Sequence, residues 1–141
     1  MAEGKKVRLR IVSEMTDPEG ARETIRNART GTLREDGEAL VLEYDDEQSG
    51  ERAHILLTAL PGEARMERRG MTRAALRFVP GARTGGAYMT LYGEIPVQTD
   101  TESVRLIRAE DGGELALRYD VYAGGDLTAH TALTVTWRVQ K

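Results

Sequence analysis

Polar side chains that could hold a small molecule occur at alternating positions among apolar residues. Successive side chains of a strand point to opposite faces, so residues two apart share a face. Asn27 and Arg29, for example, share a face with Ile25. Apolar walls with a few convergent polar groups are typical of small-molecule sites. The candidate ligand-binding residues found in this way are Asn27, Arg29, Tyr88, Tyr92 and Thr99.

Two other interpretations of these residues stay open. Strand twist or a bulge could turn the polar groups to solvent, or the groups could bond to one another inside the protein. Arg29 is the most informative of them, because burying a guanidinium group without a partner is costly. If it faces inward, it must meet an acid, backbone carbonyls, water or an anionic ligand. The favoured hypothesis is a small, anionic ligand held inside the fold.

Metal chemistry has little support in the residue types. The chain has no cysteine, and its two histidines, His54 and His130, do not have the spacing of a metal-binding pair. Residues 45–50 resemble the start of a calcium-binding loop, but the twelfth position, which should be glutamate, is Leu56. We therefore expect no metal and no cofactor.

Catalytic and phosphate-binding motifs are also missing from the sequence. The Gly-rich residues 81–86 lack the spacing of a phosphate-binding loop, and no serine lies in a G-x-S-x-G motif. Carboxylates are plentiful, but no pair of them stands out. We therefore expect a binding protein, and we rank an enzyme third among the possible functions.

Charge is unevenly distributed along a chain whose net charge is −3. Residues 35–51 contain eight acids and no bases, whereas residues 65–83 contain six arginines and a single acid, Glu67. The alternative function is therefore an interaction module that uses segment 65–83 on an anionic partner. Nucleic acid is not favoured as that partner, because exposed aromatic residues do not alternate with the arginines.

The elements that would position these residues are short strands. Apolar and polar residues alternate in long runs, and Gly, Asp and Pro mark turns between the runs. Segment 17–25 could begin a helix at Pro18, but Gly20 and a weak apolar stripe favour a turn followed by a strand. The predicted strands cover residues 5–15, 22–34, 38–45, 52–59, 63–68, 72–79, 86–92, 94–107, 115–122 and 129–139.

Consecutive hairpins without a long crossover predict an all-β fold, an antiparallel up-and-down β-barrel of 8–10 strands formed by one domain, residues 1–141. A barrel of about eight strands is just wide enough to hold one small ligand. The residues expected to face its core are Leu9, Ile11, Leu42, Leu117, Tyr119, Val121, Val135 and Trp137.

The sequence contains no run of about 20 apolar residues that could cross a bilayer. The first residues, MAEGKKVRLR, are charged and are not followed by the apolar stretch of a signal peptide. We therefore expect a cytoplasmic protein without a membrane partner.

Several motifs resemble those of a known family. They are Arg77-Phe78-Val79-Pro80-Gly81-Ala82-Arg83-Thr84, then Tyr88, Tyr92-Gly93-Glu94 and Thr99-Asp100-Thr101. In this order they are similar to the YwiB-like family of bacterial proteins of unknown function. The resemblance covers nearly the whole chain and implies a calycin-like, or lipocalin-like, β-barrel. It also adds Arg77 to the candidate ligand-binding residues, although alternation places Arg77 opposite Leu76 and Phe78.

Overall fold

The fold is a closed antiparallel β-barrel of ten strands without helices, seen in a computed structural model that describes residues 4–48 and 50–140. Each strand pairs with the next, and β1 pairs with β10 to close the barrel. The predicted fold class is confirmed. The strands are β1 (Lys5–Thr16), β2 (Arg22–Asp36), β3 (Ala39–Gln48), β4 (Glu51–Leu60), β5 (Glu63–Gly70), β6 (Arg73–Phe78), β7 (Arg83–Thr90), β8 (Gly93–Ala109), β9 (Gly112–Ala123) and β10 (Asp126–Val139).

The apolar and polar residues that alternate in the sequence form the inner and outer faces of the barrel. In β1, Val7, Leu9 and Ile11 are buried, while Arg8 and Arg10 between them are exposed. The strands are joined by tight turns, of which the Gly37 turn is typical, with a φ of 63° that favours glycine. The alternative helix near Pro18 does not form, because residues 18–19 make a turn and β2 follows.

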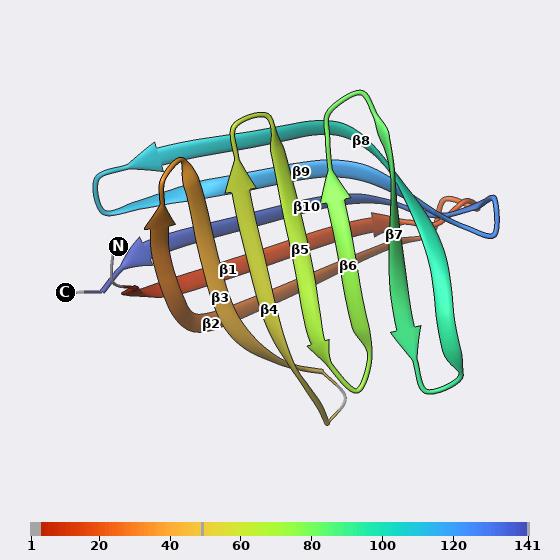
Figure 1. Ribbon diagram of the computed structural model, residues 1–141, viewed down its shortest axis with the longest axis horizontal. Helices are drawn as coiled ribbons and strands as arrows, with labels where there is room; N and C mark the ends of the chain where they lie inside the picture. Colours follow the sequence, from red (N-terminus) through yellow and green to blue (C-terminus); the bar gives the residue numbers. More distant parts are fainter. Residues whose placement is uncertain (1–3, 49, 141) are drawn as a thin grey trace.

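The barrel is built from two layers whose strands cross at a steep angle (Figure 1). One layer holds β9, β10 and β1 with parts of β2 and β8, and the other holds β3 to β7. β2 and β8 pass from one layer to the other, so each pairs with different neighbours along its length. The first part of β2 pairs only with β1, and its last residues, 34–36, pair only with β3.

Gly31 lies where β2 changes its pairing. It faces Val7 on β1 and Tyr44 on β3 at the same time. A Cβ atom at this position would lie 2.2 Å from the backbone oxygen of Glu43 and 2.9 Å from Leu9 Cδ1. Only glycine allows the strands to approach so closely here.

The buried apolar residues form one core cluster, to which β7 adds only the partly buried Tyr88 among the described residues. Trp137 is buried, as predicted, and its indole ring lies against Gly113. Tyr119 and Val121 are partly buried and pack against the core, and the other predicted core residues are buried. Among the residues that the structure describes, no helix is long and apolar enough to cross a membrane.

One strand differs clearly from the prediction. The sequence pattern indicated a strand at residues 86–92 after a glycine-rich connection, but β7 begins at Arg83 and ends at Thr90. Gly85 and Gly86 therefore lie within the strand, opposite Gln98 and Val97 of β8. The hairpin turn falls at residues 91–92, because Gly93 supplies the positive φ that follows it.

Candidate ligand site in the barrel interior

Four of the six candidate residues lie on the inner face of the barrel. Asn27, Arg29 and Tyr88 are partly buried, and Thr99 is almost completely buried. Asn27 and Arg29 lie on β2 opposite Ile11 and Leu9 of β1, whose side chains belong to the core. The alternating pattern therefore predicted the orientation of these four residues correctly.

The inward placement of Arg77 and Tyr92 was wrong. Arg77 lies on the outer face of β6 between the buried Leu76 and Phe78, and it donates a 2.7 Å hydrogen bond to Glu63. The alternating pattern predicted that Arg77 faces outward. Its inclusion among the interior candidates came only from the family resemblance. Tyr92 is 100% exposed, since it lies in the β7–β8 turn rather than in a strand.

Arg68 is the interior cation that sequence analysis missed. It belongs to a single row of paired residues that runs across five strands, in the order Tyr44, Ile55, Arg68, Ala74 and Tyr88. Residues in one row of a sheet point to the same side. Arg68 thus lies between two tyrosines, and only the methyl group of Ala74 separates it from Tyr88 along the row.

The guanidinium group of Arg68 has weak partners. Its Nε donates a 3.3 Å hydrogen bond to Thr72 Oγ1, and its Nη2 lies 3.9 Å from Glu51 Oε1, which is too far for a hydrogen bond. Glu51 Oε1 instead accepts hydrogen bonds from the backbone N–H and the hydroxyl of Thr72. The Arg68 side chain keeps 20% of its surface exposed. It is thus a mostly buried cation whose ion pair with Glu51 is long and lacks a direct hydrogen bond.

Arg29, by contrast, is already neutralised. Its Nε and Nη2 donate hydrogen bonds of 3.1 and 2.8 Å to Asp46 Oδ1, and its Nη1 donates to the backbone oxygen of Ala28. An acid and a backbone carbonyl thus meet the requirement that the sequence raised for a buried arginine. Arg29 borders the site, but its charge is not available to a ligand in the way that the charge of Arg68 is.

Tyrosine hydroxyls surround this part of the interior. Burial is the main cause that raises the pKa of Tyr44 to about 12, with a further increase from Asp46, while Arg29 and Arg68 oppose it. Burial likewise raises the pKa of Tyr88, and Arg68 opposes the shift. Burial also raises the pKa of Tyr119, whose ring contacts Phe78 at a centroid distance of 4.6 Å. At neutral pH these phenols are protonated and can donate hydrogen bonds.

Two buried hydroxyls lie deeper in the barrel. The side-chain oxygens of Thr99 and Thr101 on β8 are buried and have no hydrogen-bond partner among the described residues. Thr101 is paired with Tyr119 of β9, so this polar strip continues from the tyrosines. Buried side-chain oxygens are usually bonded to protein or to ordered water. Thr99 and Thr101 are therefore places where a polar atom of water or ligand would be stabilised.

The arginines of segment 65–83 do not form one exposed basic surface. Arg68 points into the barrel, and Arg65 and Arg77 share Glu63 on the outer face. Arg69 pairs with Glu67. Arg83 donates two 2.7 Å hydrogen bonds to Asp100, and its guanidinium group lies 4.4 Å from the centre of the Tyr122 ring. Acids of the same strand or of the next one thus lie beside the exposed arginines Arg65, Arg69, Arg77 and Arg83.

The histidines lie on the outside, each beside an acid of the neighbouring strand. His54 Nδ1 is 2.9 Å from Asp45 Oδ1, and its Nε2 is 3.2 Å from Glu43 Oε2. His130 Nδ1 is 2.5 Å from Asp120 Oδ1. Within residues 4–48 and 50–140, no group of three or more acids and histidines has an arrangement suited to a metal ion.

Comparison with known proteins places this barrel in a family. A family model described as "Domain of unknown function (DUF1934)" matches residues 9–135. The chain belongs to this family. It is also 26% identical over 126 residues to the "Uncharacterized beta-barrel protein YwiB" of Bacillus subtilis (strain 168), a match that covers 89% of each chain. The resemblance noted in the sequence is therefore confirmed.

The same barrel occurs in a solved structure. The crystal structure of the ywiB protein from Bacillus subtilis matches 99% of this chain and 96% of that chain, with a TM-score of 0.89 and 24% sequence identity. This likeness supports the ten-stranded fold. What the family leaves open is the role of the interior, which has to be argued from the side chains of this chain.

Proposed function

We propose that the protein binds a small aromatic carboxylate inside the barrel, with Arg68 as the anchor for the negative charge. The observation that carries this proposal is the mostly buried guanidinium of Arg68, whose ion pair with Glu51 is long, at 3.9 Å. A partly desolvated cation gains more from an anion than an exposed one does, because water competes less. Arginine also offers a planar pair of donors that matches a carboxylate.

The groups around Arg68 favour an aromatic ring as the body of the ligand. Tyr44 and Tyr88 lie two strands away on either side of Arg68, and the small residue Ala74 lies between Arg68 and Tyr88. Aromatic rings pack well against one another in tilted arrangements, as Phe78 and Tyr119 do deeper in the barrel. The phenol groups and the Thr99 and Thr101 hydroxyls would bond polar atoms of such a ligand.

The interior is also the natural place for a ligand in this architecture. Barrels grow wider with strand number, and eight-stranded lipocalins already hold one small molecule. Ten strands close this barrel, and Arg68, Thr99 and Thr101 are polar residues on its inner face. A cytoplasmic location, expected from the sequence, is part of the same proposal.

The test is a binding measurement with benzoate and with benzyl alcohol, an uncharged molecule of similar shape. Both are titrated into the wild-type protein and two variants, Arg68→Gln and Arg77→Gln. We expect benzoate to stabilise the wild-type protein against thermal unfolding, as any ligand specific for the folded state does. Arg68→Gln should lose this effect and Arg77→Gln, on the outer face, should keep it.

Two results would contradict the proposal. One is equal stabilisation by benzyl alcohol, which would mean that charge plays no part. The other is unchanged benzoate binding by Arg68→Gln, which would place the site elsewhere. If Arg68→Gln is poorly folded, Arg68→Lys keeps the charge while removing the planar fork, and should bind benzoate more weakly than the wild-type protein does.

A further inference from the structure

A second basic site lies on the outside of the barrel, where the two terminal strands meet. Arg8 on β1 is directly paired with Arg138 on β10, and both side chains are exposed. Arg10 is the next outward residue of β1, and it is paired with Thr136. Like charges directly opposite each other on one face of a sheet are destabilising. This arrangement therefore needs a reason other than stability.

These three arginines differ from several arginines of the outer surface that lie beside acids. Arg34 pairs with Glu43 at 2.7 Å, and Arg83 pairs with Asp100 at the same distance. In the part of the chain that the structure describes, no carboxylate lies within ion-pair distance of Arg8, Arg10 or Arg138. Three guanidinium groups thus lie together on this surface, and Asp111 is an acid that lines the same groove.

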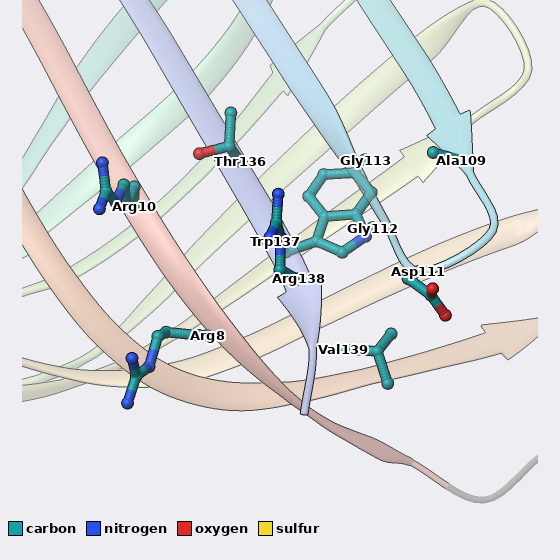
Figure 2. Close-up of a pocket in the computed structure, with 10 residues that line it drawn as sticks. All are labelled: Arg8, Arg10, Ala109, Asp111, Gly112, Gly113, Thr136, Trp137, Arg138 and Val139. Carbon is teal, nitrogen blue, oxygen red and sulfur yellow. The ribbon is translucent and has the colours of Figure 1, made fainter. Parts of the chain in front are cut away.

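The arginines border a hollow. The row that contains Arg8 and Arg138 continues through Gly112 on β9 to Ala109 on β8, so two small residues follow two large ones. The resulting groove has a volume of about 1140 Å³. Figure 2 shows Arg8 and Arg10 along β1 on one side of the groove, with Arg138 beside them on β10 and the two glycines of β9 beyond.

The floor of the groove is fixed by close packing. A Cβ atom on Gly112 would lie 2.4 Å from the backbone oxygen of Trp137, so no side chain can be added there without moving a strand. The β8–β9 turn, with Asp111, forms the far edge. The groove thus has a cationic side, a flat floor of backbone and an edge that limits the length of a ligand.

We propose that this groove binds a small phosphorylated molecule that carries at least two negative charges, such as a diphosphate. Three guanidinium groups match a multiply charged anion, whereas a single carboxylate would neutralise only one of them. Each arginine fork can donate two hydrogen bonds to a phosphate group. The hydroxyl of Thr136 lies between Arg10 and Glu114 in the neighbouring row and offers one more donor. The hollow over Gly112 and Ala109 receives the rest of the molecule.

The experiment measures pyrophosphate binding by isothermal titration calorimetry at low salt. The wild-type protein is compared with Arg8→Gln, Arg138→Gln and a matched control, Arg73→Gln, which removes an exposed arginine from the opposite layer. We expect affinity to fall by about tenfold or more in each of the first two variants, because each loses charge-assisted hydrogen bonds. Arg73→Gln should bind as the wild-type protein does.

Three results would overturn the proposal. An equal loss of affinity in all three variants, with Arg73→Gln as weak as Arg8→Gln, would show only general attraction by positive charge. Succinate binding as tightly as pyrophosphate would exclude a preference for phosphate. A single-stranded oligonucleotide that binds while pyrophosphate does not would identify a polymer as the partner instead. Arg68→Gln serves to separate this site from the interior, since it should leave pyrophosphate binding unchanged.

Discussion

Arg29 and Asp46 join β2 to β3 just beyond the point where the hydrogen-bonded ladder between these strands has ended. The last pair of that ladder is Gly31 with Tyr44, and Arg29 and Asp46 are the next inward residues of the two strands. Their side chains form two hydrogen bonds to one carboxylate oxygen. A side-chain contact thus continues the closure of the barrel after the backbone contacts stop.

The first prediction concerns this ion pair. Arg29→Ala leaves Asp46, whose side chain is only 11% exposed, without its cation. Removing one partner of a buried pair costs about 3–5 kcal/mol, and the partial exposure of Arg29 reduces the expected loss in unfolding free energy to about 2–3 kcal/mol. Urea denaturation measures this loss.

The matched control is Arg34→Ala, which breaks an exposed ion pair with Glu43 on the outer face of the same two strands. We expect it to cost less than about 1 kcal/mol. The double substitution Arg29→Met with Asp46→Leu should recover most of the stability lost in Arg29→Ala. Equal losses in Arg29→Ala and Arg34→Ala would show that the inner pair does not hold the strands together.

The second prediction concerns the bend in β2. Gly31→Ala places a Cβ atom 2.2 Å from the Glu43 backbone oxygen, so the strands must move apart. Overpacking of this kind costs about 1–3 kcal/mol of unfolding free energy. Gly85→Ala is the control, because a Cβ atom there meets nothing within 4 Å. The account fails at this point if Gly31→Ala is as stable as Gly85→Ala.

The third prediction concerns pH. The hydrogen bond to Asp45 is the main cause that raises the pKa of His54, with a further increase from Glu43, while partial desolvation opposes it. A raised folded-state pKa stabilises the folded protein fully below the unfolded value of about 6.5, and the effect is lost as pH rises through the folded pKa. Stability should therefore fall across this window.

His54→Gln should flatten the pH dependence of stability above about pH 6.5. Asp45→Asn should lower the midpoint of the His54 resonance in an NMR titration, because it removes the main cause of the shift. An NMR midpoint that does not move in Asp45→Asn would contradict the assigned cause.

Much of the fold could be predicted because alternation in this sequence is so regular. In β6, for example, buried and exposed residues alternate without exception from Arg73 to Phe78. The β7 boundary was missed because glycine occurs both in turns and where strands approach closely. Gly86 belongs to the second kind, since a Cβ atom there would lie 2.5 Å from the Ala75 backbone oxygen.

The candidate site was only partly predictable for a different reason. Alternation says which face a residue occupies, and it correctly placed Asn27, Arg29 and Tyr88 inside. It does not say which acid meets which arginine, because those pairs depend on the register between neighbouring strands and on the side-chain conformations. Arg68 shares its face with the buried Ala64 and could have been found by alternation, but the neighbouring arginines made it look like part of an exposed segment.

The outer groove could not be found from the sequence at all. Arg8 and Arg138 are at opposite ends of the chain, and only the pairing of β1 with β10 brings them together. Within segment 65–83, alternation turns Arg68 inward, and the exposed Arg77 and Arg83 lie beside Glu63 and Asp100. A run of like charges in the sequence therefore does not have to form a charged patch on the surface of the barrel.

The central claim is that Arg68 binds an anion inside the barrel, and NMR can observe that side chain directly. The arginine Nε–Hε resonances of the ¹⁵N-labelled protein are followed during a titration with benzoate, with the Arg68 signal assigned by its absence in Arg68→Gln. We predict a saturable shift of the Arg68 signal while the Arg77 signal stays in place. An Arg68 signal that does not move at saturating benzoate, or a shift confined to Arg8, Arg10 and Arg138 on the outer face, would contradict the account.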